Sequence, residues 1–192
     1  MKTKIGVMGS AQGPTLSRNG GVLKAQELGK WIAKTDCILV NGACPGLPNE
    51  SAIGAKESGG FVIGVSPAFS EKEHRELYRS PENAYDIILY TGMGLMERDI
   101  LNIRSSDAII LVGGGIGTLN EFTVAYDEGK IVGVLTGTGG ISEHIPEVLE
   151  MCNRDLNERI IFGDDPKELV EKIVLAIKEL PKITMEDERI IK

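Results

Sequence analysis

The sequence predicts an α/β fold in which helices cover both faces of a mainly parallel sheet of about seven strands. Short apolar runs alternate with helical patterns through almost the whole chain, which is typical of β-α-β units. Glycine-rich turns follow several of these runs, at the strand ends where open α/β sheets bind ligands. A chain of 192 residues is long enough for one substantial core and short for two. We therefore expect one Rossmann-like domain over residues 1–180 and a polar tail over residues 181–192.

The apolar runs place the strands along the chain. The run Ala108–Val112 is bounded by Asp and Gly and is too short for a buried helix, so we expect a central strand that is covered on both faces. The other runs have similar lengths and similar boundaries. Strands are predicted at residues 5–9, 37–40, 61–65, 86–90, 108–112, 131–135 and 159–162.

Helices are expected between these strands. Apolar residues at helical spacing predict a helix over 22–33, after a loop at 12–21 that contains Gly and Pro. Asn49 can cap a helix over 50–58, and Thr118 can open another that continues to about residue 128. Pro166 suits the first turn of a helix over 166–179. A charged helix that carries Arg98, a short helix with a loop that could cover a site within 68–84, and a helix around 143–151 complete the prediction.

Composition excludes several classes of protein. A net charge of −7 argues against a broad nucleic-acid surface, which needs a basic face. No stretch approaches about 18 uninterrupted apolar residues, and the N-terminus lacks a signal-peptide pattern, so we expect a cytoplasmic protein without a membrane span. Three cysteines without a close pair (Cys37, Cys44 and Cys152) fit reduced thiols that fill space, and neither a metal site nor a bound cofactor is predicted.

The stretch around the central strand carries the strongest functional signal. Gly113, Gly114, Gly115 and Gly117 follow this strand and remove four side chains from the turn. Backbone amides can approach an anion closely there, and the N-terminus of the helix that begins at Thr118 adds unpaired N–H groups and the positive end of a dipole. The turn therefore predicts an anionic ligand, with phosphate as the expected group.

Several standard motifs are missing. The first strand is followed by GSAQG instead of GxGxxG, so a nicotinamide-dinucleotide site is poorly supported, and neither a GxxxxGK[ST] phosphate loop nor a GxSxG nucleophile turn occurs. His74 and His144 lie in polar or helical surroundings without a nucleophile nearby in sequence, so we expect solvated or capping histidines.

Glu121 and Arg98 each allow two interpretations. Thr118 and Glu121 have the spacing of a capping box, a structural role worth about 1 kcal/mol. Alternatively, Glu121 lies one turn inside the site and acts on the ligand. Arg98 belongs to a run of alternating charges that suits a solvated helix face, whereas a planar guanidinium close to the glycine turn also suits phosphate. The spacing alone does not choose between these interpretations.

The same residues resemble a known family. Arg98, followed by Asp107 and then by Gly114-Gly115-Ile116-Gly117-Thr118-Leu119-x-Glu121, is similar to the PGGxGTxxE signature of the LOG-like proteins, long called "lysine decarboxylases". The likeness extends to Gly9-Ser10 and to the turn at Gly42, and it spans about residues 4–135. No lysine lies in a recognisable pyridoxal-phosphate setting, so the decarboxylase label gains no support.

This resemblance implies both an activity and a set of site residues. Active LOG enzymes hydrolyse the N-glycosidic bond of a cytokinin nucleotide. The resemblance therefore implies Arg98 and Glu121 as the catalytic pair. It also implies a phosphate-binding and ligand-binding set within a nucleotide-binding domain, and a homodimer or larger homo-oligomer in which a neighbouring chain completes the site. The implied ligand-binding residues are Gly9, Ser10, Gly42, Gly114, Gly115, Gly117 and Thr118.

Two positions depart from the pattern of the active enzymes. Gly113 replaces the proline of PGG, and Asp99 stands where those enzymes carry lysine, which predicts weaker binding of a nucleoside monophosphate. The chain looks closer to a branch that includes the molybdenum cofactor carrier protein, whose members bind a phosphorylated pterin. Three interpretations therefore stay open, namely a nucleoside 5′-monophosphate phosphoribohydrolase, a non-catalytic carrier or sensor of a phosphorylated ligand, and a scaffold whose glycines only permit tight packing.

Overall fold

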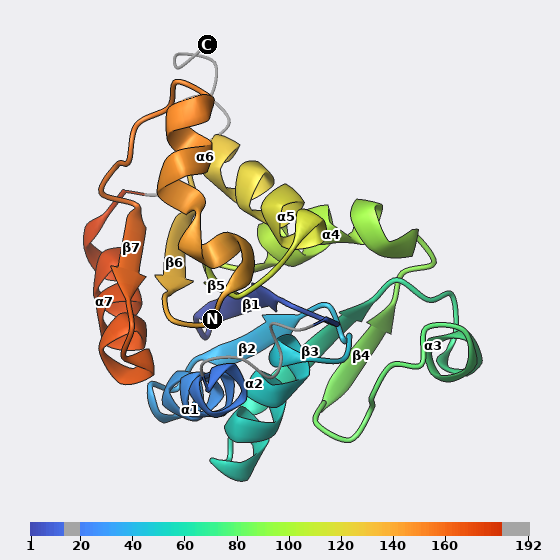
Figure 1. Ribbon diagram of the computed structural model, residues 1–192. Coiled ribbons are helices and arrows are strands. Elements are labelled where there is room, and N and C mark those ends of the chain that lie inside the picture. The colour runs from blue at the N-terminus through green and yellow to red at the C-terminus, as the bar shows by residue number, and fades with distance from the viewer. Residues whose placement is uncertain (14–19, 182–192) are drawn as a thin grey trace.

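One parallel sheet of seven strands forms the centre of the protein (Figure 1). The computed structural model describes residues 1–13 and 20–181. Within these residues every strand pair is parallel, and the strand order is β4-β3-β2-β1-β5-β6-β7. The predicted fold class is confirmed. The strands are β1 (Lys4–Gly9), β2 (Ile38–Asn41), β3 (Phe61–Ser66), β4 (Ile87–Tyr90), β5 (Ala108–Val112), β6 (Ile131–Leu135) and β7 (Ile160–Gly163).

Helices cover both faces of the sheet, as expected. α1, α2 and α7 form a layer on one face, α4, α5 and α6 lie on the other, and α3 lies beyond the edge strand β4 (Figure 1). None of the described helices combines the length and the apolar content needed to cross a bilayer. The helices are α1 (Gly21–Lys34), α2 (Leu47–Glu57), α3 (Glu71–Glu76), α4 (Gly94–Ser105), α5 (Ile116–Asp127), the 3₁₀ helix η2 (Gly140–Glu143), α6 (Ile145–Met151) and α7 (Pro166–Glu179).

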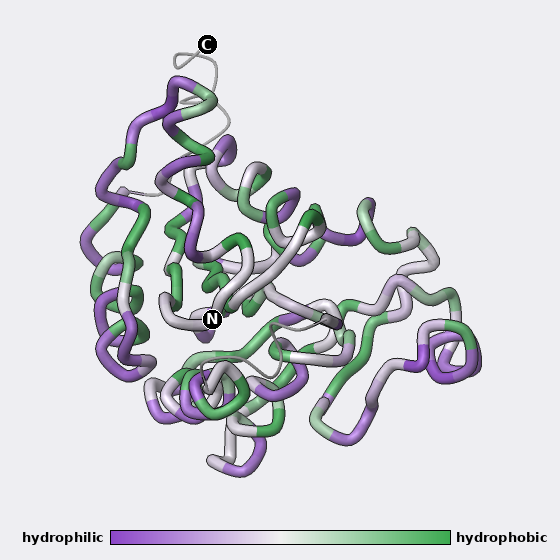
Figure 2. Tube along the Cα trace, viewed as in Figure 1, coloured by the Kyte–Doolittle hydropathy of each residue, from purple (hydrophilic) through white to green (hydrophobic). Residues whose placement is uncertain are grey.

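The central strand β5 shows why the sheet divides the core into two parts. All five of its residues are buried, and their side chains point alternately to opposite faces. Ala108, Ile110 and Val112 pack in the cluster beneath α1, α2 and α7, whereas Ile109 and Leu111 pack in the cluster beneath α4, α5 and α6. A strand covered on both faces reads as a continuous apolar run. Figure 2 shows this hydrophobic colouring along the inner strands and more hydrophilic segments on the outer helices.

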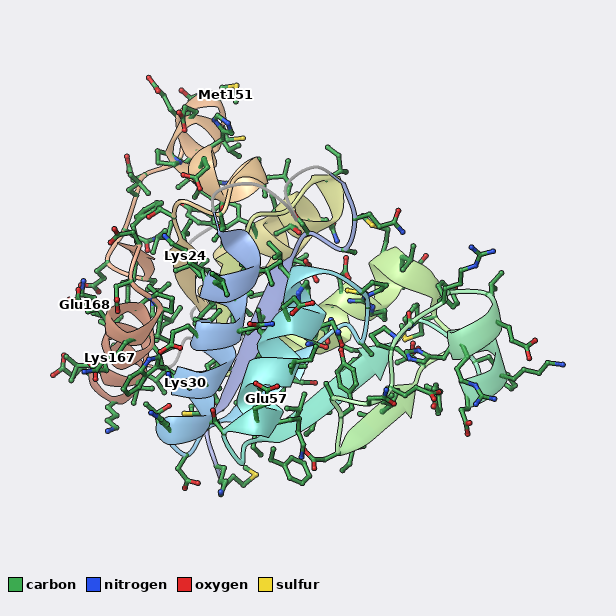
Figure 3. The ribbon with its side chains drawn as sticks, turned by 60° about the horizontal axis from the view of Figure 1, so that its bottom comes forward. Lys24, Lys30, Glu57, Met151, Lys167 and Glu168 are labelled. Carbon is green, nitrogen blue, oxygen red and sulfur yellow. The ribbon has the colours of Figure 1, made fainter. Side chains whose placement is uncertain are left out.

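The outer surface of the α1, α2 and α7 layer carries charged side chains. Lys30 of α1, Glu57 of α2, and Lys167 and Glu168 of α7 lie on this side (Figure 3). Lys24 of α1 instead donates through Nζ to the carbonyl of Thr136 at 2.9 Å, which ties this helix to the loop after β6.

Some helix boundaries differ from the prediction. α2 begins at Leu47 instead of residue 50, so Asn49 lies inside the helix and Gly46 occupies the N-cap. The physical reason is a long-range contact, because the Leu47 amide donates to the Ser10 carbonyl at 2.9 Å and the Leu47 side chain is fully buried. The helix expected around 143–151 is divided into η2 and α6. Of the loop expected at 12–21 and the tail at 181–192, residues 14–19 and 182–192 lie outside the described part of the chain.

Two further expectations were wrong. His74 is fully buried instead of solvated, with Nδ1 at 2.8 Å from the Ser66 hydroxyl and Nε2 at 3.1 Å from the Pro81 carbonyl. The 68–84 segment is therefore held to β3 by a buried side chain. Cys37 does fill space in the core, but Cys152 is exposed at the end of α6. All three cysteines are free thiols, as predicted.

The strand order creates a crevice between β1 and β5. From β1 the chain adds strands outward through β2, β3 and β4, and it then returns to add β5, β6 and β7 on the other side. Ligands of open α/β sheets bind outside the carboxyl ends of the strands at such a switch point. The two strands end side by side, with Gly9 opposite Val112, and a Cβ at Gly9 would overlap the Val112 carbonyl oxygen.

Candidate functional site

A cavity of about 470 Å³ lies at the carboxyl ends of the central strands. Its lining comes from the segments that follow β1, β2 and β5 and from the first turns of α4 and α5. The fold therefore brings to one place residues that are far apart in the sequence. The lining includes all nine residues predicted for the site: Gly9, Ser10, Gly42, Arg98, Gly114, Gly115, Gly117, Thr118 and Glu121.

The first turn of α5 leaves backbone donors open to this cavity. Gly115 is the N-cap and no side chain caps the helix. The first intrahelical bond runs from the Leu119 amide to the Gly115 carbonyl at 2.9 Å. Among the described residues, no acceptor takes the amides of residues 115–118, which are the four that a helix start leaves unpaired. Four N–H groups and the positive end of the helix dipole thus form a cradle for negative charge.

The capping-box interpretation of Thr118 and Glu121 was wrong. A capping box needs Thr118 at the N-cap, but the helix begins at Ile116, so Thr118 is its third residue. The helix begins earlier than predicted because Gly115 takes the N-cap position, and no side chain caps it. Neither side chain therefore satisfies the helix start.

The turn before α5 is held by its own hydrogen bonds. Gly113 and Gly114 have positive φ values of 64° and 99°. The Gly113 amide donates to Oγ1 of Thr138 at 2.9 Å, and the Gly114 amide donates to Oγ of Ser10 at 2.7 Å. Because both amides are already paired, the donors available to an anion begin at Gly115 and not at Gly114. Ser10 and Gly114 therefore shape the cradle instead of offering these groups to a ligand.

Gly115 and Gly117 face open space. A Cβ at either position would meet no atom of the described residues within 4 Å, whereas a Cβ at Gly114 would lie 2.5 Å from Cβ of Thr118. A scaffold that uses glycine only for tight packing would show contacts at all of these positions. The open positions therefore argue against the scaffold interpretation.

Arg98 is a buried residue of α4 and does not belong to a solvated helix face. Its exposed fraction is 5%, and Nη1 lies 3.0 Å from Oδ1 of Asp99. The Asn102 amide, in the orientation that satisfies both of its groups, accepts from the same Nη1 at 2.7 Å and donates to the Asn41 carbonyl at 3.3 Å. A Cβ at Gly42 would overlap the guanidinium, so the turn after β2 needs glycine to make room for Arg98.

Asp99 is the buried partner of that arginine. Only 4% of the residue is exposed, and its second oxygen, Oδ2, accepts from Nδ2 of Asn120 on α5 at 3.1 Å. Burial raises the pKa of the Asp99 carboxyl, and the Arg98 charge opposes that shift. The weaker nucleotide binding expected from Asp99 stays a prediction. The Asp99 carboxyl contacts Arg98 and is not an isolated charge in the cavity.

Glu121 lies on α5 and is buried at the same point. Oε1 lies 3.8 Å from Nη1 of Arg98, and the residue is 7% exposed. Burial raises the pKa of Glu121 to about 8, and the nearby Asp99 carboxylate adds to the shift while Arg98 opposes it. A carboxyl with this pKa can donate a proton near neutral pH and can accept one as its conjugate base. Titratable groups perturbed in this way gather at functional sites.

The prediction missed the apolar side of the cavity. Leu95 and Met96 of α4 line its mouth and are 55% and 45% exposed. The apolar pair directly before the charged run at 97–99 was the available signal, because it places exposed apolar side chains one turn from Arg98. Cys44 also lines the cavity, and burial raises the pKa of its thiol to about 11, so the thiol stays protonated.

Comparison with known sequences connects this geometry with one family. A family profile described as LDcluster4, the SLOG cluster4 family, matches residues 2–170. A protein of Archaeoglobus fulgidus described as uncharacterized is 38% identical over 111 residues, which cover 58% of this chain and 68% of that protein. The cytokinin riboside 5′-monophosphate phosphoribohydrolase of Rhodococcoides fascians is 34% identical over 103 residues, which cover 51% of this chain and 48% of the enzyme. The match thus spans about half of that relative.

A solved structure shares almost the whole fold. The molybdenum cofactor carrier protein of Chlamydomonas reinhardtii superposes with a TM-score of 0.73 at 32% sequence identity. This similarity covers 93% of the present chain and 100% of the carrier protein.

Proposed function

Because this chain belongs to the SLOG cluster4 family, within the LOG-like superfamily, we propose that its cavity binds a phosphorylated, nucleotide-like ligand. The observation that carries the proposal is the set of four amides at residues 115–118, for which the described residues offer no acceptor. Gly115, Gly117 and Thr118 line the same cavity as buried Arg98. The N-terminus of a helix with free amides is an anion-binding site. In this pose the phosphate occupies the cradle, and the ring of the ligand lies against the apolar wall of Leu95 and Met96.

The first candidate activity is hydrolysis of the N-glycosidic bond of a nucleoside 5′-monophosphate. The bond between C1′ and the base nitrogen breaks, water supplies the new oxygen on C1′, and the departing nitrogen receives a proton. Protonated Glu121 can give that proton and, as carboxylate, then take one from water and stabilise positive charge on the sugar. Arg98 fixes the anionic substrate. The products are the free base and ribose 5-phosphate.

The test is release of ribose 5-phosphate from purified protein incubated with adenosine, guanosine, cytidine and uridine 5′-monophosphates. We expect release from at least one nucleotide and a loss of about 100-fold or more in the Glu121→Gln variant, the usual size of an acid-base contribution. Absence of product from all four nucleotides, or equal rates for the two proteins, would contradict hydrolysis.

The second candidate is a carrier or sensor that binds without turnover, with the molybdenum cofactor as one such ligand. Two observations favour it: Asp99 already neutralises Arg98, and the likeness to the carrier protein extends over 93% of the chain. It predicts saturable binding of a phosphorylated pterin or nucleotide with no product formed. Gly115→Trp should abolish this binding while the protein stays folded, because the space at Gly115 is open. Unchanged binding in that variant would place the ligand elsewhere.

We also propose that a second copy of the chain covers the mouth of the cavity. Apolar side chains 37–55% exposed extend along the edge strand β4 and α4, and Leu95 and Met96 belong both to this surface and to the cavity lining. Figure 2 shows the hydrophobic colouring of β4 at the sheet edge. Exposed apolar edge strands and patches mark association surfaces. The β4–α4 surface consists of Ile87, Leu89, Tyr90, Met93, Leu95, Met96, Ile100 and Leu101.

Sedimentation velocity tests this association. We expect a dimer or larger assembly for the wild-type protein and a monomer for Ile100→Glu, because the charge would be buried without a partner in the interface. Leu175→Glu is the matched control. Leu175 on α7 is 52% exposed, and α7 packs against β6 and β7, at the opposite edge of the sheet from β4. A wild-type monomer, or equal dissociation by both variants, would contradict the proposal.

A further inference from the structure

One nitrogen of the Arg98 guanidinium, Nη1, gives its hydrogen bonds to neighbours other than Glu121. An Nη nitrogen carries two hydrogens. Nη1 lies 2.7 Å from the Asn102 amide oxygen and 3.0 Å from Oδ1 of Asp99, whereas Oε1 of Glu121 is 3.8 Å away. The two short contacts use both hydrogens of Nη1. Glu121 is therefore close enough for Coulombic attraction but receives no hydrogen bond from this nitrogen.

Within residues 1–13 and 20–181, the surroundings offer Glu121 little else to stabilise a negative charge. The charged groups of this part of the chain that act on it are Asp99 and Arg98, both on α4. Cys44 faces it from the segment after β2 as a neutral thiol. Asn120, its neighbour on α5, donates to Asp99. One guanidinium thus stands between two buried carboxyl groups.

The net charge of this buried group depends on whether one of its two carboxyls holds a proton. With both carboxyls ionised, the group of Arg98, Asp99 and Glu121 carries a net charge of −1 in a buried place, and with one proton it is neutral. A buried charge without a partner is costly, so one of the two carboxyls holds a proton. Asp99 has two hydrogen-bond donors, Arg98 and Asn120, which favour its ionised form. The proton therefore belongs on Glu121.

We propose that Asp99 is a positioning residue which, by holding Arg98, keeps Glu121 as a neutral acid. The second part of this inference rests on the proposed function. A phosphate ester in the cradle binds beside a protonated Glu121, whose O–H faces a hydrogen-bond acceptor on the ligand. Ionised Glu121 would repel the phosphate, so binding retains this proton. The ligand class is thus an anion that also carries an acceptor atom, as a purine or pterin ring does.

Infrared spectroscopy of the ligand-free protein tests the role of Asp99. At pH 7 the wild-type protein should show a carboxylic-acid carbonyl band that is absent from Glu121→Gln. Asp99→Asn removes the carboxylate charge that neutralises Arg98 and repels an ionised Glu121, so the band should titrate away at a pH at least one unit lower. Asn120→Ala is the control, because it removes a hydrogen bond from Asp99 but leaves the charge in place, and the band should persist at pH 7. No band at pH 7 in the wild-type protein, or an unchanged midpoint in Asp99→Asn, would overturn the inference.

Calorimetry with adenosine 5′-monophosphate and with inorganic phosphate tests the link to binding. Between pH 7 and 9.5 the wild-type dissociation constant should rise by about tenfold per pH unit once the Glu121 midpoint is passed, and that of Glu121→Gln should stay flat. Binding without any pH dependence in the wild-type protein would overturn the proton linkage. Failure of both probes to bind, together with the expected infrared behaviour, would contradict the proposed function and support the role of Asp99.

Discussion

Two arginines on the same helix have opposite surroundings. Arg98, in the first turns of α4, has a side chain that is 6% exposed, and it lies against buried Asp99. Arg104, near the end of α4, has a side chain that is 60% exposed, and it contacts Glu128 at 2.8 Å. The exposed pair contributes little to stability because water competes for both charges. The buried pair must stay together because either partner alone would be an uncompensated charge. Buried ionisable groups beside a cavity are therefore better explained by function than by stability.

Two helix starts repeat the contrast. α7 begins with Asp165, whose side chain accepts from the Glu168 amide at 2.9 Å, and Pro166 follows in the first turn. Its unpaired donors are thus reduced by the chain itself. α5 begins with Gly115 and has no side-chain cap. A side-chain cap would stabilise α5, but its N-terminus, which faces the cavity, has none. A local departure from the most stable arrangement is expected at a functional site.

The largest effect should come from the two arginines. We expect Arg98→Ala to lower the free energy of unfolding by about 3 kcal/mol, because it leaves Asp99 buried without its partner. Arg104→Ala should cost less than about 1 kcal/mol. Urea denaturation of both variants measures the difference. Equal losses would mean that the burial of Arg98 carries no energetic consequence.

The pH dependence of stability tests the buried group around Arg98 further. The pKa of Glu121 is raised to about 8 in the folded protein, from an ordinary value of 4.5. The folded state then holds a proton that the unfolded state loses, so the contribution of Glu121 is fully present below pH 4.5 and is lost as the pH rises through about 8. We expect the stability of Glu121→Gln, relative to that of the wild-type protein, to increase by about 2–4 kcal/mol between pH 5 and pH 8.5, since one pKa unit corresponds to about 1.4 kcal/mol.

Denaturation of the two proteins at several pH values measures this gain. Asp99 contributes in the same direction, because its pKa is also raised, but it is present in both proteins. The difference between them therefore isolates Glu121. A constant difference from pH 5 to pH 8.5 would show that Glu121 is ionised throughout this range.

The positions of the strands were predicted from the sequence more accurately than the burial of the charged residues. Strand positions follow from local apolar runs, and Ala108–Val112 was correct to the residue. The burial of Arg98 could not be predicted in this way, since a run of alternating charges suits a solvated face. It depends on Gly42, which the fold brings against the guanidinium from a distant part of the chain. The start of α2 likewise depends on the Ser10 carbonyl, which belongs to the segment after β1. Long-range contacts of this kind leave no periodic signal.

Two neighbouring glycines, Gly114 in the turn before α5 and Gly115 at its N-cap, should differ in their effect on stability. Gly114 has a φ of 99°, and a Cβ there would press on Thr118, so Gly114→Ala should lose about 1–3 kcal/mol of stability. Gly115 has a negative φ and open space, and Gly115→Ala should stay within about 0.5 kcal/mol of the wild-type protein. Thermal unfolding compares the two. A similar loss in both would mean that the cradle is packed as tightly as the turn before it.

The smallest expected effect concerns the two helix starts. Asp165→Ala should destabilise the protein by about 1 kcal/mol, because it removes the acceptor for the Glu168 amide. Thr118→Val should change stability by less than about 0.5 kcal/mol, since the Thr118 hydroxyl caps nothing in the described structure. If that hydroxyl contacts phosphate, however, the same substitution should weaken the binding of adenosine 5′-monophosphate severalfold, whereas Asp165→Ala should leave binding unchanged. Asp165→Ala thus lowers stability without changing binding, and Thr118→Val weakens binding without changing stability. A loss of stability in Thr118→Val equal to that in Asp165→Ala would show that Thr118 serves the helix after all.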